Sequence, residues 1–392
     1  MSNAASVAPE IRGFCDTRFE ALRDAFRGNF QRHDELGAAL AVMLEGRLVV
    51  DLWGGFADRA KTRPWRRDTL VDVFSVGKAM ASVCAMRLVE QGALDLDALV
   101  ASVWPEFAAA GKEAVTLRQL LSHQAGLPAI RQPMPAGAML DWPRMTAALE
   151  ATEPWWEPGA RHGYHVNTYG FLVGEVVRRA SGERIGRYFR EKFATPLQLD
   201  FYFGVGNVGD ERIAEYLHLL ETVDNMPLRW EGPDGTPLSA EQQEMILKAH
   251  NNPPGFSGNG MVNRRDWREA EIPSTGAHGH ARSVARFYGA LAGGGTPVLA
   301  PETLELWTRA ESSGVDALLG RRSRFGLGIQ LTQKERPLGP NPHSYGHYGA
   351  GGALGFADPD ARLGFGYLIN RMQVGWQNPK NLALLEALYS CL

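Results

Sequence analysis

The sequence is poor in cysteine and lacks the long apolar run that a membrane-spanning helix needs. Only Cys15, Cys84 and Cys391 occur in 392 residues, and their odd number and wide spacing argue against a disulfide framework or a cysteine zinc site. No stretch approaches the roughly 18 to 20 apolar residues of a membrane span. The first residues also lack a basic start followed by an apolar segment. We therefore predict a cytoplasmic protein without a membrane partner, although a signal removed upstream would leave the same sequence.

The chain has no excess of positive charge either. Lysine and arginine number 41 against 44 aspartate and glutamate, for a net charge of -3. Such a chain has no surplus of positive charge to neutralise phosphates, so a nucleic-acid partner is not expected. The histidines follow no standard ligand spacing, so neither a metal site nor a cofactor is predicted; those considered were His123, His162, His278 and His280.

The apolar pattern predicts a sheet built from both ends of the chain. Two strand-like runs flank Glu45-Gly46 and predict an antiparallel hairpin. Further strands are predicted late in the chain, at 324–331, 352–360 and 362–370. Helical spacing of apolar residues marks 18–34, 76–91, 281–292 and 379–390. The fold class is therefore α/β of the α+β type, with one antiparallel sheet flanked by helices.

The middle of the chain has a different character. Between 106 and 279, helical segments alternate with loops rich in proline and glycine, and only 200–205 looks like a strand. A chain of 392 residues is long enough for about two domains. We expect residues 1–105 and 280–392 to form one α/β domain and 106–279 to form an inserted, mostly helical domain. Small-molecule sites are common in the cleft between two such parts.

Ser75 and Lys78 form the clearest chemical pattern. If Ser75 opens the predicted helix, Lys78 lies one turn later on the same face. A serine hydroxyl needs a base to take its proton, and a lysine serves only if burial or nearby cations lower its pKa. The alternative is a helix cap with a surface lysine, but apolar residues surround the pair in the sequence. The nucleophile elbow of α/β-hydrolases, Gly-x-Ser-x-Gly, is absent, so a Ser-His-Asp triad has no anchor.

Two further segments add candidate residues. Tyr164 follows a Pro-Gly turn just before a predicted helix and could serve as general base or acid. The glycine-rich segment from Gly346 would let a substrate approach the backbone, with the N–H of Ala350 donating to an oxyanion opposite that of Ser75. Packing in the helical part and a bulged edge strand are the structural alternatives for these segments. Residues assigned to the oxyanion and substrate site are Ser75, His347, Gly349, Ala350, Trp155 and Trp156.

The order of these motifs resembles the serine β-lactamase and penicillin-binding-protein superfamily. Ser-x-x-Lys at Ser75 comes first, the segment holding Tyr164 second, and His-x-Gly at His347 last. Within the superfamily, the sequence is most similar to the class C β-lactamase branch and to family VIII carboxylesterases, over roughly residues 20 to 390. The resemblance implies that Ser75 is acylated, that Lys78 and Tyr164 manage the protons, and that His347 lies beside the oxyanion hole. It also implies a β-lactamase/transpeptidase-like fold.

Two departures from the lactamase pattern bear on the substrate. The family's Tyr-x-Asn becomes Tyr164-His165-Val166, with Asn167 one residue late. The usual Lys-Thr-Gly becomes a motif that begins with His347, and histidine is mostly neutral near pH 7. Both changes favour a neutral ester over a β-lactam.

We therefore predict a carboxylesterase that cleaves small to medium esters through an acyl-enzyme on Ser75. Transacylase activity and weak β-lactam hydrolysis are expected as side activities. The alternatives are a β-lactamase or D-alanyl peptidase, and a catalytically inactive binding protein of the same fold. The partner is a small-molecule ester, and the sequence does not determine the oligomeric state.

Overall fold

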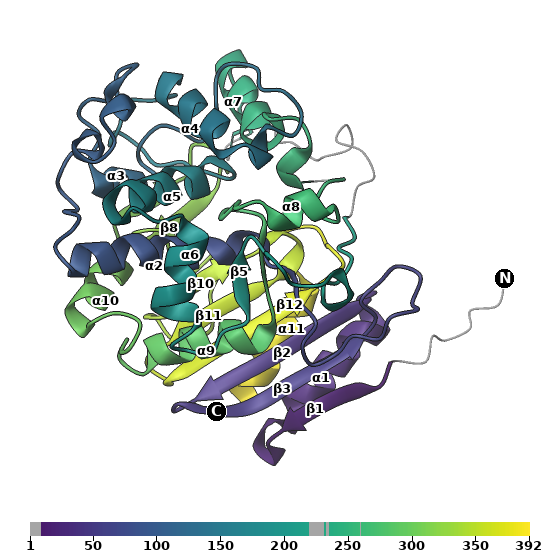
Figure 1. Ribbon diagram of the computed structural model, residues 1–392. Helices are drawn as coiled ribbons and strands as arrows, with labels where there is room; N and C mark the ends of the chain where they lie inside the picture. The colour runs from purple at the N-terminus through teal and green to yellow at the C-terminus, as the bar shows by residue number, and fades with distance from the viewer. Residues whose placement is uncertain (1–8, 219–230, 233–234, 259) are drawn as a thin grey trace.

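A computed structural model describes residues 9–218, 231–232, 235–258 and 260–392, and its largest element is a nine-stranded antiparallel sheet (Figure 1). The strand order is β1-β3-β2-β12-β11-β10-β9-β8-β7. Strands from the two chain ends are neighbours, because β2 pairs with β12 along its whole length. The predicted α+β fold class is thereby confirmed. The strands are β1 (Ile11–Cys15), β2 (Gly37–Leu44), β3 (Arg47–Gly55), β7 (Ser312–Val315), β8 (Arg322–Phe325), β9 (Gln330–Leu331), β10 (Tyr345–Tyr348), β11 (Leu354–Asp358) and β12 (Leu363–Ile369).

Local sequence explains how the central strands turn and how closely they are covered. Glu45 and Gly46 both have positive φ, at 51° and 77°, as a two-residue hairpin between β2 and β3 requires. Helix α9 (Ala281–Ala292) lies directly on the sheet. A Cβ at Gly364 of β12 would come within 2.1 Å of the Gly289 backbone nitrogen, so this close approach needs glycine. Helices α1 (Glu20–Arg32) and α11 (Pro379–Ser390) pack together in a separate core on the sheet.

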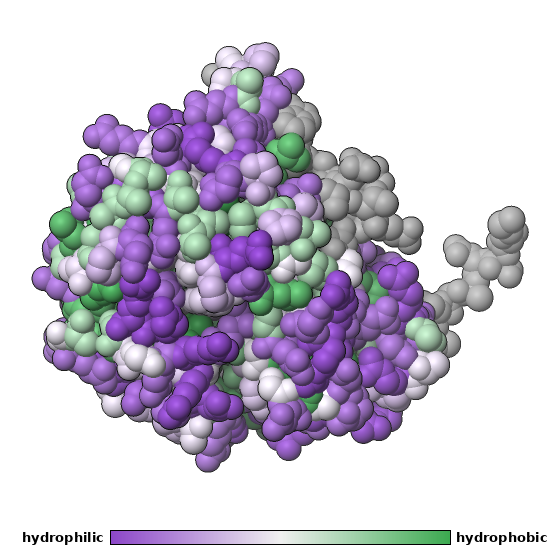
Figure 2. All heavy atoms as spheres, turned by 45° about the horizontal axis from the view of Figure 1, so that its top comes forward, coloured by the Kyte–Doolittle hydropathy of each residue, from purple (hydrophilic) through white to green (hydrophobic). Residues whose placement is uncertain are grey.

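The helical part of the molecule surrounds helix α2 (Gly77–Glu90), which is buried along most of its length. Hydrophilic residues cover most of the face seen in Figure 2, with apolar residues between them. No described helix is long and apolar enough to cross a membrane. The other helices are α3 (Leu117–Leu121), α4 (Trp142–Ala151), α5 (Thr168–Ser181), α6 (Ile185–Phe189), α7 (Ala240–Asn251), α8 (Arg265–Glu269) and α10 (Pro301–Thr308).

A second, smaller sheet positions the start of α2. Its order is β4-β6-β5, built from β4 (Val71–Asp72), β5 (Phe201–Phe203) and β6 (Ala277–Gly279). It joins a strand from before residue 105 to strands from the 106–279 segment, so the predicted division into 1–105 with 280–392 and 106–279 stays a prediction.

Two details of the predicted strands differ from the structure. The run predicted as one strand over 324–331 is divided, because residues 326–329 form a bend between β8 and β9. Strand β1 was not predicted. Only Ile11 of its five residues is buried and Phe14 is 55% exposed, so the strand has no alternating apolar pattern to indicate it.

Candidate active site

Ser75 lies in the tight turn that links β4 to α2. The preceding residue, Phe74, has a φ of 49°, an unfavourable backbone conformation for a bulky side chain. The carboxylate of Asp72 holds this turn, because it accepts a hydrogen bond from the Phe74 N–H at 2.8 Å. Its other oxygen accepts one from the Trp267 indole N–H at 3.4 Å. Burial raises the pKa of Asp72 to about 8, against the lowering effect of these bonds.

Lys78 is fully buried one helical turn after Ser75, and its Nζ lies 3.1 Å from Ser75 Oγ. Nζ also donates to the carbonyl oxygens of Val166, at 2.7 Å, and Ser274, at 3.0 Å. Burial lowers the pKa of Lys78 well below its usual value, and no described carboxylate counters it. In its charged form this amine donates to Ser75 Oγ as well as to the two carbonyls. In its neutral form it has two N–H donors, which the two carbonyls use, and its lone pair faces the Ser75 hydroxyl.

Tyr164 lies directly against this pair, in the loop before α5. Lys78 Nζ is 4.9 Å from the centroid of the Tyr164 ring. Burial raises the pKa of Tyr164 far above its usual value, although the nearby Ser75 hydroxyl lowers it somewhat. Tyr164 is therefore a neutral phenol at physiological pH, suited to give a proton rather than to act as a phenolate base. The ring is stacked on Phe325 at 5.8 Å and meets the edge of Trp376 at 5.0 Å.

Asp316 holds the Tyr164 backbone in place, and sequence reasoning did not find it. Both of its carboxylate oxygens lie 3.1 Å from the Tyr164 N–H. The same buried carboxylate accepts hydrogen bonds from the N–H groups of Leu318 and Leu319 and from the Ser323 hydroxyl. Asp316 comes 152 residues after Tyr164 in the chain, and a lone aspartate in a loop carries no local signal of such a role.

Replacing Asp316 by alanine is expected to weaken both stability and activity. Four donors would lose their acceptor in a buried place, so the free energy of unfolding should fall by about 3 kcal/mol. The kcat of the variant molecules that remain folded should also fall about 10-fold, because the Tyr164 backbone is no longer held in position. Urea unfolding and ester turnover would measure the two effects. Asp360→Ala is the matched control, since Asp360 is exposed and pairs with His343; equal losses in both variants would contradict the role of Asp316.

The late glycine-rich strand lies beside the Ser75 turn, as expected. A Cβ at Gly349 would lie 2.6 Å from the Val73 carbonyl oxygen, so the two backbones touch there. His347, on β10, is fully buried with its ring 5.9 Å from that of Tyr164. Burial and nearby Lys78 lower its pKa to about 3, so this histidine is neutral at pH 7. Ala350 follows in a short turn and accepts a hydrogen bond from the Tyr216 hydroxyl at 3.1 Å. Its N–H as an oxyanion donor stays a prediction.

The two tryptophans lie near Tyr164 but are held by packing. The Trp155 indole N–H donates to the Ala129 carbonyl oxygen at 2.9 Å, and the Arg131 guanidinium lies 3.8 Å over the ring. Trp156 is buried in the same apolar cluster as Tyr164. Contact of either tryptophan with an acyl group stays a prediction.

The histidines and the late asparagine also have structural partners. His165 Nε2 accepts the Leu127 N–H at 3.1 Å, and Asn167 Nδ2 donates to the Ala249 carbonyl oxygen at 3.0 Å. The Asn167 amide is therefore engaged with α7. Among the described residues, no group of three or more histidine, cysteine or acidic side chains could hold a metal ion.

Comparison with known proteins gives one consistent result. A family model described as Beta-lactamase matches residues 22–388. The chain is 32% identical to "Esterase/beta-lactamase LipL" of Mycobacterium tuberculosis, over 92% of this chain and 83% of that protein. It is 27% identical to "Esterase EstB" of Burkholderia gladioli, over 99% of both chains.

Solved structures agree with these relatives. A family VIII carboxylesterase superposes with a TM-score of 0.88 at 40% identity, covering 98% of this chain and 100% of that one. A penicillin-binding-protein homologue from Caulobacter crescentus superposes with a TM-score of 0.87 at 36% identity, over the same shares of the two chains.

Proposed function

Because this chain belongs to the beta-lactamase family, we propose that it is a carboxylesterase that forms an acyl-enzyme on Ser75. One observation carries the proposal: Ser75 Oγ lies 3.1 Å from the Nζ of a fully buried lysine. An exposed lysine would be protonated at neutral pH and could not accept the serine proton. The similarity to a family VIII carboxylesterase and to two proteins named as esterases supports an ester as the substrate.

The reaction follows from the positions of three side chains. Ser75 Oγ attacks the ester carbonyl carbon, and its proton passes to the neutral amine of Lys78. The backbone N–H groups of Ser75 and Ala350 stabilise the oxyanion. Collapse breaks the bond to the leaving oxygen, which takes a proton from the Tyr164 hydroxyl. Tyr164 regains a proton from Lys78. Water then attacks the acyl-enzyme, giving its proton to the same two residues, and Ser75 Oγ is the leaving oxygen that takes a proton back.

The residues at the two altered family motifs favour an ester over a β-lactam. The strand beside the Ser75 turn carries a neutral His347 in place of a fixed positive charge. The Asn167 Nδ2 donates to the Ala249 carbonyl oxygen of α7, which turns this amide nitrogen towards α7 and not towards a lactam side chain. Transfer of the acyl group to an alcohol instead of water would be a side activity of the same intermediate. Slow hydrolysis of β-lactams is expected on the same grounds.

The test compares an activated ester with an activated lactam. Purified protein is incubated with p-nitrophenyl butyrate and, separately, with nitrocefin, and each coloured product is followed. We expect kcat/KM for the ester to exceed that for nitrocefin by about 100-fold or more. Comparable values would favour the β-lactamase or D-alanyl peptidase alternative, and no product from either would favour an inactive binding protein.

A further inference from the structure

Two arginines from separate loops meet on one tryptophan beside Tyr164. The guanidinium carbons of Arg321 and Arg336 lie 4.8 Å and 5.7 Å from the Trp376 ring centroid. Trp376 in turn contacts the Tyr164 ring, edge to face, at 5.0 Å. Exposure increases along this series, because Tyr164 is 1% exposed, Trp376 is half-buried and Arg321 is exposed. The arginines therefore lie on the path from the reacting groups towards solvent.

Their charge is not neutralised by close partners. Neither guanidinium forms an ion pair with a carboxylate within the described ranges of the chain. Asp316 attracts both, but its oxygens already accept hydrogen bonds from the Tyr164 N–H and from three other donors. Glu335 is the other nearby carboxylate, and it pairs with Arg322 at 3.6 Å. Three arginines against two carboxylates leave a positive charge beside Trp376.

Both guanidinium groups can still bind an anion, Arg336 through an unpartnered nitrogen and Arg321 through its charge. Arg336 Nη2 donates to the Arg322 carbonyl oxygen at 2.6 Å, whereas its Nη1 is buried and has no hydrogen-bond partner in the described structure. Partial desolvation by the surrounding protein and the neighbouring Arg336 lower the pKa of Arg321 to about 10, which leaves this surface arginine charged at neutral pH. Holding two like charges together costs free energy unless an anion joins them.

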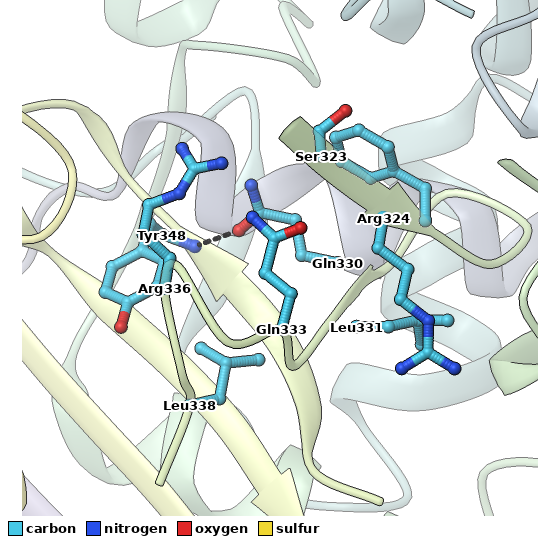
Figure 3. Close-up of a pocket in the computed structure, with 9 residues that line it drawn as sticks. Ser323, Arg324, Gln330, Leu331, Gln333, Arg336, Leu338 and Tyr348 are labelled. Carbon is cyan, nitrogen blue, oxygen red and sulfur yellow. Dashed lines mark hydrogen bonds between the residues drawn. The ribbon is translucent and has the colours of Figure 1, made fainter. Parts of the chain in front are cut away.

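The small cavity that Arg336 lines cannot hold that anion. It has a volume of about 10 Å³ and is lined by Gln330, Gln333 and Tyr348 among others, which leaves room for about one water molecule. Figure 3 shows the Arg336 guanidinium turned away from Leu338, at the opposite side of this cavity. Arg321 does not line this cavity, so an anion held by both arginines lies at Trp376, the ring that both guanidinium groups face.

We propose that Arg321 and Arg336 bind a carboxylate on the alcohol portion of the ester substrate. This inference rests on the proposed esterase function. Tyr164 protonates the leaving oxygen, so the alcohol portion lies on the Tyr164 side of the reacting carbonyl and extends along Trp376. Guanidinium groups match carboxylate geometry with paired hydrogen bonds. The sequence motif at His347 predicted a neutral ester, but these arginines lie outside that motif and restore a positive charge from other loops.

The experiment uses two esters that yield the same acetyl-enzyme. Sodium 4-acetoxybenzoate carries the carboxylate on the leaving group, and methyl 4-acetoxybenzoate carries a neutral ester there. The quantity measured is the ratio of their kcat/KM values, charged over neutral. We expect Arg321→Gln and Arg336→Gln each to lower this ratio by about 10-fold, as for the loss of one charge-assisted hydrogen bond. Arg321→Lys should retain part of the preference, because the charge remains.

An arginine far from the site provides the control. Arg187 is exposed and paired with Glu191 at 2.8 Å, so Arg187→Gln should leave the ratio as in the wild type. Added salt should lower the wild-type ratio, because it screens a partly exposed anion contact; this measurement needs no variant. Turnover of both esters with a ratio unchanged by Arg321→Gln, Arg336→Gln and salt would overturn the anion site alone. Failure of both esters in the wild type would overturn the proposed function and this inference with it.

Discussion

A Ser75→Ala variant is expected to form no acyl adduct and to lose at least about 10,000-fold in kcat/KM, as when a covalent nucleophile is removed from other serine hydrolases. The buried Lys78 Nζ lies 3.1 Å from Ser75 Oγ, and alanine leaves that amine with no hydroxyl to deprotonate. Intact-protein mass spectrometry after exposure to p-nitrophenyl acetate would detect the acetyl adduct as a mass gain of about 42 Da. Released p-nitrophenol is followed in the same sample.

A second buried serine on the same helix controls for general damage. Ser82 Oγ accepts the Trp307 indole N–H at 3.0 Å and donates to the Ala79 carbonyl oxygen at 3.1 Å. Ser82→Ala should cost about 1 kcal/mol of stability and should still form the adduct. An adduct that persists in Ser75→Ala would assign the nucleophile to another residue.

Replacement of Lys78 is expected to have the second largest effect. Lys78→Met removes the base, and Lys78→Arg places a permanent positive charge there that cannot accept a proton. Both should lose at least about 1,000-fold in the rate of acylation. Single-turnover release of p-nitrophenol measures that rate. Turnover by Lys78→Arg near the wild-type level would show that the residue contributes charge and not proton transfer.

The pH dependence separates this role from simple loss of structure. Burial lowers the Lys78 pKa well below 10.5, so wild-type kcat/KM should rise through that lowered pKa and already be on its plateau far below pH 10.5. The free energy of unfolding should also rise with pH in this range. Between the folded and unfolded pKa values the unfolded state binds the extra proton, so the free energy of unfolding rises with pH by up to about 1.4 kcal/mol per unit. Lys78→Met should lack this component in urea unfolding at several pH values, and an unchanged slope would mean that Lys78 is charged in the folded protein.

The sequence by itself determined the parts of this protein that depend on local chemistry. The hairpin at Glu45-Gly46 and helix α11 follow from turn residues and apolar spacing, and both were predicted within one or two residues. The pairing of Ser75 with Lys78 was predicted for the same reason, because one helical turn brings residues three apart together wherever the helix lies. The order of the motifs was enough to indicate the family.

Only the tertiary structure decided which distant groups surround Tyr164. Asp316 reaches Tyr164 across 152 residues, and Arg321 and Arg336 meet on Trp376, which comes later than both. No local spacing encodes such contacts, because they depend on how β7, β8 and the loop before α11 pack against Tyr164. The lowered pKa of Lys78 also depends on burial by the whole fold. Sequence patterns report residues that share a turn or a face, whereas long-range packing sets burial and charge, and these set the chemistry.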